Sequence, residues 1–271
     1  MNTLLKRIGM LILGAAIMVG ASAMPTMAAG KETDMITYDG RSIKKDALSQ
    51  ETLEWIEWYG MLSEEEKDMV SYEPSELSET LKTRSSLTDT EDALGQEGNS
   101  TSIMSRTASL LPTSEYEPKY NPKYWNKDSN IRRANCYAYA MDVLKRTEGK
   151  LQPGSSAGKK YKSLTKSSII SAVKADGPFL GSGRTIKKAT RTQKPGKNEY
   201  KVALVIAPNA DYHWYIQNRN GYWSHKRGLT KVSNLDASNK KIKDPKSCNR
   251  NYGSLNYSTW CGYYIVKYTG K

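Results

Sequence analysis

The order of patterns along the second half of the chain predicts an α+β fold. Of the 271 residues, those after about residue 115 carry helical patterns first and a series of strand patterns afterwards. Strands joined by short turns pair antiparallel, whereas parallel sheets need a crossover between strands. About 155 residues are enough for one such domain with its own core. A sharp change of charge before residue 115 predicts a smaller region ahead of this domain.

Two helices are predicted at the start of the domain. The first lies within residues 131–147, with Asn135 as a plausible N-cap, and the second spans residues 163–175. Gly149 and the following Pro153-Gly154 pair stop the first helix. The apolar side chains expected to face the core are Tyr139, Met141, Val143 and Leu144 in the first helix and Ile169, Ile170 and Val173 in the second.

Four strands are predicted after the helices because Val, Ile, Tyr and Trp are concentrated there. They span residues 201–207, 211–217, 222–226 and 259–268. Between the second and third strands we expect a three-residue loop that ends at Gly221 in the left-handed conformation. The domain at residues 115–271 is therefore predicted to pack helices against an antiparallel sheet.

Charge divides the chain. Residues 31–114 hold 8 basic and 18 acidic side chains, a net charge of −10, whereas residues 115–271 hold 31 and 10, a net charge of +21; two basic residues near the start complete the total of +13. Halves of such opposite charge rarely share one core. The positive charge could serve solubility alone, or it could bind anionic wall polymers or lipid headgroups. Nucleic acid is not expected outside the cell.

The first 29 residues predict a secretory signal peptide. A positive start precedes an apolar run at residues 8–19, and small residues lead up to Ala23 and Ala29. The run is shorter than the about 20 residues that span a bilayer, which favours cleavage after Ala23 or Ala29 over an uncleaved anchor. We expect the mature protein to be secreted and extracellular, and association with a cell wall is the finer expectation.

Between the signal peptide and the domain, residues 30–82 predict an acidic helical segment and residues 83–114 a flexible linker rich in Ser, Thr and Gly. A first helix in the segment ends at Gly60. A capping box of Ser63 and Glu66 starts a second helix. This segment could be a prosegment lying over an active site, or it could be an independent helical hairpin.

The chemistry of the domain is expected to depend on Cys136, His213 and His225, in a chain with only three cysteines and two histidines. Cys136 lies in the first turn of its helix, where the dipole and unpaired amides favour the thiolate. A thiolate and an imidazole in contact form an ion pair, and the imidazole can then protonate a leaving amine. This pattern predicts a cysteine nucleophile with His213 as its base.

His225 follows His213 by twelve residues across the predicted hairpin. Because the loop has an odd number of residues, positions separated by an even number point to the same face of the sheet. His225 can therefore orient the first imidazole, the third role of a catalytic triad. The alternative is an exposed strand residue beside two basic neighbours.

These residues resemble those of the NlpC-type cell-wall peptidases of the papain-like superfamily. The resemblance consists of Cys136 at a helix start, an apolar strand at residues 202–207, a strand beginning His213-Trp214-Tyr215-Ile216, and His225 about a dozen positions later. It implies that Cys136 is the nucleophile, His213 the general base and acid, and His225 the orienting residue. The family often has a tyrosine near the oxyanion site where Tyr124 stands, although Tyr124 could equally be a structural aromatic.

The resemblance covers roughly residues 115–268 and implies a papain-like core and an amide substrate, plausibly a peptidoglycan stem peptide. The sequence departs from the family by reading Asn135-Cys136-Tyr137 where Asp-Cys-Ser-Gly is usual. This departure puts the expected substrate in doubt more than it does the pairing of Cys136 with His213.

The other two cysteines, Cys248 and Cys261, could form a disulfide, which would leave Cys136 free. Alternatively, Cys261 is a small core residue of the last strand. No paired spacing of cysteine or histidine predicts a metal site, no Gly-x-Ser-x-Gly motif predicts a serine nucleophile, and no cofactor is expected.

Three functions fit these observations. The first is a secreted cysteine peptidase or amidase. The second is a non-catalytic module that binds a cell wall or polyanion. The third is an acyltransferase or transglutaminase-like enzyme that uses the same thiol and base.

Overall fold

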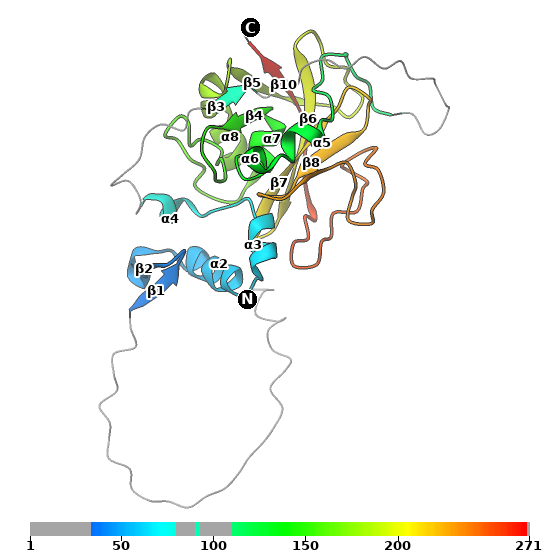
Figure 1. Cartoon of the computed structure of the whole chain (residues 1–271). Helices are drawn as coiled ribbons and strands as arrows, with labels where there is room; N and C mark the ends of the chain where they lie inside the picture. The colour runs from blue at the N-terminus through cyan, green and yellow to red at the C-terminus, as the bar shows by residue number, and fades with distance from the viewer. Residues whose placement is uncertain (1–33, 80–89, 93–109, 270–271) are drawn as a thin grey trace, which may run out of the picture. The chain divides into compact units, whose positions relative to one another are not determined.

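The computed structural model describes residues 34–79, 90–92 and 110–269 (Figure 1). The expected signal peptide lies outside these residues. The chain divides into two compact units at Lys45. In the first unit, β1 (Met35–Tyr38) and β2 (Arg41–Lys44) form an antiparallel hairpin. Asp39 and Gly40 both have positive φ, as the tight turn between the strands requires. The acidic segment expected to be helical over residues 30–82 therefore contains a β-hairpin near its start.

The second unit is built on a six-stranded sheet in the order β5-β10-β6-β7-β8-β9, in which every neighbouring pair is antiparallel. Its strands are β5 (Arg184–Ala189), β6 (Glu199–Ala207), β7 (Asp211–Gln217), β8 (Trp223–Lys226), β9 (Val232–Ser233) and β10 (Thr259–Tyr268). The predicted antiparallel sheet and mixed helix-and-strand composition are confirmed. Strands β5 and β9 were not predicted, because three of the six residues of β5 are basic and β9 is only two residues long.

Strand β7 lies in the middle of the core, and all seven of its residues are buried. Successive side chains of a strand point to opposite faces. On one face, Trp214 meets Tyr137 of α7 (Cys136–Ala140), with ring centroids 6.4 Å apart. On the other face, the ring of His213 lies 5.0 Å from that of Tyr257, in the connection between β9 and β10. Both faces of the strand are therefore covered, which explains its continuous apolar and aromatic character.

The predicted helix of residues 131–147 is wrong in its length. The chain forms α6 (Asp128–Ile131), then α7, and then strand β4 (Val143–Lys145). Asp142, with φ of +52°, ends the helical path, and the β-branched Val143 starts the strand. The predicted N-cap is confirmed, because the side chain of Asn135 accepts a hydrogen bond from the amide of Ala138 at 3.2 Å.

Strand β4 pairs with β3 (Thr90–Asp92), so part of the expected linker is a strand. The rest of that linker is described only from residue 110 onward. The second predicted helix is confirmed as α8 (Lys166–Asp176), with Thr165 as N-cap and with Ile169 and Val173 buried. Ile170 is only half-buried. The short helix α5 (Pro122–Trp125) precedes α6.

The acidic segment forms α2 (Gln50–Gly60), α3 (Glu64–Met69) and α4 (Ser75–Glu79). The capping box of Ser63 and Glu66 is confirmed. These helices belong to the same compact unit as the basic domain. Trp55 of α2 is buried and donates from Nε1 to the carbonyl of Ala210 at 2.9 Å. The acidic helices and the basic domain were expected to be two separate regions, but in the structure they pack against each other.

Candidate functional site

The hairpin of β7 and β8 brings the two histidines together. Its loop is residues 219–221, and Gly221 has φ of +82°, as predicted. His225 pairs directly with Tyr215, so His213 lies diagonally across the same face. Nε2 of His213 is 2.8 Å from Nδ1 of His225. The prediction that both imidazoles share one face of the hairpin is therefore confirmed.

The hydrogen bonds of the pair fix the protons on both rings. Nε2 of His225 lies 3.0 Å from the carbonyl of Leu235, which can only accept, so this nitrogen carries a proton. In a neutral ring Nδ1 of His225 is then an acceptor, and Nε2 of His213 donates to it. This leaves Nδ1 of His213 as an unprotonated nitrogen. It is buried and has no hydrogen-bond partner in the described part of the chain.

Burial keeps both rings neutral. The two rings are fully covered, and Tyr215, Tyr252 and Tyr257 surround them at centroid distances of 5.0–6.1 Å. Desolvation lowers the pKa of His225 to about 4 and the pKa of His213 well below its usual value. A neutral imidazole with a free nitrogen is the protonation state that a general base needs before the reaction starts.

Cys136 is the first residue of α7 and is fully buried. Its sulfur lies 3.8 Å from the carbonyl oxygen of Tyr212, the residue immediately before His213. Burial and the nearby Asp211 raise the pKa of the thiol, while the Trp214 amide and Lys226 act in the opposite direction. The expectation of a lowered thiol pKa is wrong for this state, because complete desolvation outweighs the start of a five-residue helix.

The structure does not join the thiol to the imidazole pair. Helix α7, which carries Cys136, packs on the face of the sheet that holds Trp214 and Ser224, whereas His213 and His225 point to the opposite face. No hydrogen bond links Cys136 to His213 among residues 110–269. The ion pair of the sequence analysis is not formed in this state, in which both groups are uncharged.

Tyr124, the expected oxyanion-site residue, lies in α5. Its ring packs against Trp125 at 5.6 Å, and its carbonyl accepts from Asn130. Trp125 is the residue of α5 that reaches the cysteine helix, with its ring 4.9 Å from that of Tyr139.

The predicted disulfide is not formed, because Cys136, Cys248 and Cys261 are all free thiols. The surroundings of the last two differ. The sulfur of Cys248 lies 3.5 Å from the carbonyl of Pro245, in the connection before β10, whereas Cys261 lies at a bulge within β10. The alternative of a small core residue holds for Cys261, which is buried.

Two charged residues of the site were not singled out from the sequence. Asp211 is fully buried at the start of β7, accepts from the hydroxyl of Tyr257 at 2.8 Å, and has its pKa raised to about 7 by burial. Lys226 donates to the carbonyls of Ile131 and Thr230, both at 2.7 Å, and burial lowers its pKa to about 7. The sequence offered one sign of a functional role for each of them, a charged residue inside an apolar strand pattern.

No group of His, Cys, Asp and Glu side chains in the described ranges could hold a metal ion. None of the described helices is long and apolar enough to cross a bilayer.

The fold and site define an α+β protein that buries a free thiol and a histidine pair on opposite faces of one sheet. No family model and no solved structure matches the chain. Insoluble matrix shell protein 1 of Ruditapes philippinarum is 37% identical over 132 residues, which cover 49% of this chain and 81% of that protein. The chain belongs to the same family as this shell protein.

We expect the stability of the fold to depend on pH because His225 is buried. Between its unfolded pKa of about 6.5 and its folded pKa of about 4, the unfolded chain binds a proton that the folded chain excludes, so stability falls as the pH falls through this window. We expect the stability advantage of the protein over His225→Gln to shrink by about 2 kcal/mol between pH 7.5 and pH 5.

Denaturant unfolding of both proteins at the two pH values measures this difference. Asp211 titrates in the same range with the opposite effect, because its raised pKa makes the folded chain bind the extra proton. It is present in both proteins, so its contribution cancels. A difference that stays constant with pH would contradict a buried neutral His225.

Proposed function

We propose that the protein is an exported cysteine hydrolase of amide bonds with a papain-like core. Cys136 is the nucleophile, His213 the general base and acid, and His225 the residue that orients His213. The observation that carries this proposal is the free Nδ1 of His213, which the bonds to His225 and the Leu235 carbonyl leave unprotonated. His213 is next in sequence to Tyr212, whose carbonyl contacts the sulfur.

The proposed reaction requires a rearrangement at β7, because α7 packs on the Trp214 face of the sheet and His213 points to the opposite face. Once the two groups meet, Nδ1 of His213 accepts the thiol proton, and the sulfur of Cys136 attacks the substrate carbonyl. The imidazolium then returns the proton to the leaving amine, which breaks the amide bond and forms a thioester. Water, deprotonated by the same nitrogen, hydrolyses the thioester to a carboxylate. His225 accepts from Nε2 of His213 throughout and so stabilises the imidazolium.

The substrate suggested by the NlpC resemblance is a peptidoglycan stem peptide. The name of the Ruditapes protein suggests a second setting, an extracellular shell matrix, and supports export of the chain without specifying a cell wall. An amide hydrolase could act on peptide bonds in either setting, so we propose the bond type and leave the polymer to experiment.

Incubating the purified protein with stem peptides and with matrix peptides tests the proposal. The expected products, identified by mass spectrometry, are one new carboxylate and one new amine. Iodoacetamide should block their formation. A product joined to an added amine, in place of the free carboxylate, would assign the protein to the acyltransferases. No product from any peptide, in protein whose Cys136 is accessible to iodoacetamide, would remove the catalytic proposal.

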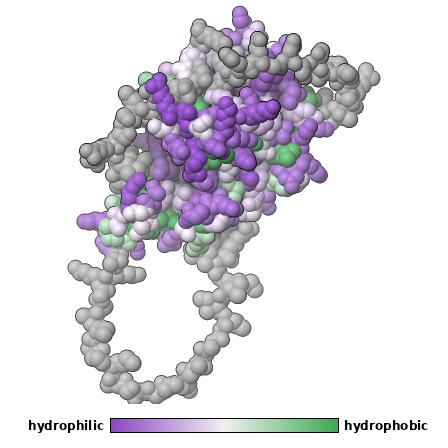
Figure 2. Space-filling view, viewed as in Figure 1, coloured by the Kyte–Doolittle hydropathy of each residue, from purple (hydrophilic) through white to green (hydrophobic). Residues whose placement is uncertain are grey.

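A second candidate function is binding to an anionic matrix polymer. It is favoured by the name of the related shell protein and by two cavities along α8 that share Ser171. The cavity lined by Lys166, Lys174 and Lys188 has a volume of about 360 Å³, and the other is about 800 Å³. Figure 2 shows a largely hydrophilic surface on the side that it draws. Salt-sensitive cosedimentation with an insoluble polyanion, undiminished by iodoacetamide, would support this function.

A further inference from the structure

The last turn of helix α3 and the segment that follows it are held against the basic domain through their main chain. We call residues 67–73 the strap. The carboxylate of Asp211 accepts from the amide of Ser71 at 3.0 Å and from the amide of Tyr72 at 2.6 Å. The side chain of Gln152 donates to the carbonyl of Ser71 at 2.7 Å. Asp211 and Gln152 are buried, so these bonds are made away from water.

Further main-chain bonds hold both ends of the strap. Lys150 donates from Nζ to the carbonyl of Lys67 at 2.9 Å, and the amide of Leu229 donates to the carbonyl of Asp68 at 2.8 Å. At the far end, the hydroxyl of Tyr161 donates to the carbonyl of Glu73 at 2.8 Å. Bonds of this kind depend on the path of the backbone and are available to any extended peptide, whatever its side chains.

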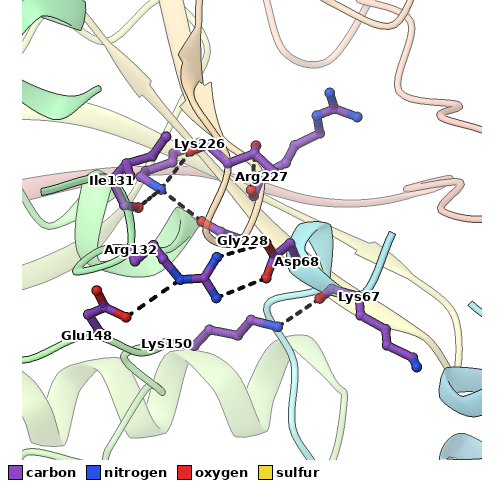
Figure 3. A network of polar contacts seen from close by, with 10 residues as sticks. Lys67, Asp68, Ile131, Arg132, Glu148, Lys150, Lys226, Arg227 and Gly228 are labelled. Atoms are coloured by element: carbon purple, nitrogen blue, oxygen red, sulfur yellow. Dashed lines mark hydrogen bonds and ion pairs between the residues drawn. The ribbon is translucent and has the colours of Figure 1, made fainter. Parts of the chain in front are cut away.

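Charge pairs add to these bonds. Asp68 of the strap lies 2.9 Å from Arg132, which also meets Glu148 at 3.6 Å, as Figure 3 shows. Glu73 lies 3.1 Å from Lys160. An acidic side chain at each end of the strap is thus paired with a basic side chain of the domain.

The strap lies beside the candidate nucleophile. Val70 and Ser71 are fully buried, as is Cys136. The carboxylate of Asp211, which binds the Ser71 amide, is one of the groups that raise the pKa of the thiol. Asp211, which holds the middle of the strap, is next in sequence to Tyr212, whose carbonyl contacts the sulfur. The strap and the thiol therefore meet at the same end of β7.

We propose that the strap occupies the peptide-binding groove of the candidate enzyme and keeps Cys136 covered. This inference rests on the proposed function and deepens it in two ways. The substrate is a peptide bound in extended form through its main chain, chiefly by Asp211 and Gln152. The protein as described is latent, and the strap must leave the groove before a substrate can enter.

Gly228 provides a sharp test, because a side chain there would collide with the strap. A Cβ at Gly228 would lie 1.9 Å from the carbonyl oxygen of Asp68, and the residue has φ of +45°. Gly253 is a matched control, since it also has a positive φ, +82°, but has open space around it. Alkylation of Cys136 by iodoacetamide, followed by peptide mass spectrometry, reports exposure of the thiol.

We expect Gly228→Ala to increase the alkylation rate of Cys136 at least tenfold and Gly253→Ala to leave it unchanged. Adding a synthetic peptide of residues 64–76 should slow the reaction in Gly228→Ala again. The buried thiol of Cys261 reports unfolding and should stay protected. Asp68→Lys, which places a positive charge beside Arg132 without a backbone change, is a second way to release the strap.

Protection of Cys136 in both Gly228→Ala and Asp68→Lys would overturn the inference. Failure of the strap and failure of the enzyme are distinguishable. An exposed Cys136 with no peptide hydrolysis would retain the strap and remove the proposed activity. Full hydrolysis by the intact chain, unaffected by either variant, would retain the activity and remove the latent state.

Discussion

Cys136→Ala is expected to lower kcat/KM for peptide hydrolysis by at least about 10⁴-fold, the scale of losses when a covalent nucleophile is removed. The thioester cannot form without the sulfur, and the remaining groups can only bind and polarise the substrate. The measurement is best made in the Gly228→Ala background as well as in the intact chain, because the strap covers the thiol of the intact chain.

The fold should survive this substitution. Alanine fits at the start of α7, which already contains two buried alanines, and the contact of the thiol with the Tyr212 carbonyl is long, at 3.8 Å. Cys261→Ala is a matched control, since Cys261 is also free and buried but lies outside the site. Hydrolysis that persists in Cys136→Ala, with a normal thermal transition, would eliminate Cys136 as the nucleophile.

The parts of the fold that were predicted correctly are those encoded by neighbouring residues. The bounds of β7 follow from a continuous aromatic and β-branched run, and those of the hairpin loop follow from Gly221, whose φ few other residues tolerate. The capping box at Ser63 is equally local. The shared face of His213 and His225 followed from loop length alone, which is why this part of the site could be anticipated.

The parts that were missed depend on contacts between distant residues. The helix-start rule predicted a lowered pKa for Cys136, but the thiol is desolvated by layers that come from elsewhere in the chain. The strap illustrates the same limit, since Ser71 and Asp211 are 140 positions apart. No composition or periodicity signals that a main-chain amide will meet a carboxylate so far along the sequence.

Opposite charge was interpreted as a sign of separate regions, and the structure gives it another meaning. The acidic helices and the basic domain share a compact unit, and pairs such as Asp68 with Arg132 lie between them. Complementary charge can join two segments as readily as it can mark a boundary. The composition alone does not distinguish these cases, because it carries no information on which surfaces face each other.

His213→Ala is expected to lower kcat/KM by about 10³-fold, and His225→Ala by about 10- to 100-fold. His213 moves the proton in each step, and general acid–base catalysis contributes about 10²- to 10⁴-fold. His225 acts through His213. Removal of His225 leaves the Nε2 proton of His213 buried without an acceptor, which costs about 1–3 kcal/mol. The His213 ring is then less well oriented, and its charged form is less well stabilised.

His225→Asn is the informative companion variant, since an amide oxygen can replace the Nδ1 acceptor and should recover part of the loss. A merely structural role for His225 would lower the yield of folded protein without changing kcat/KM per active thiol, which titration with iodoacetamide measures. Equal losses in the two alanine variants, or a larger loss in His225→Ala, would exchange the roles of the two histidines. The bond from His225 to the Leu235 carbonyl argues against that exchange, because it commits Nε2 of His225 to donation and leaves the free lone pair on His213.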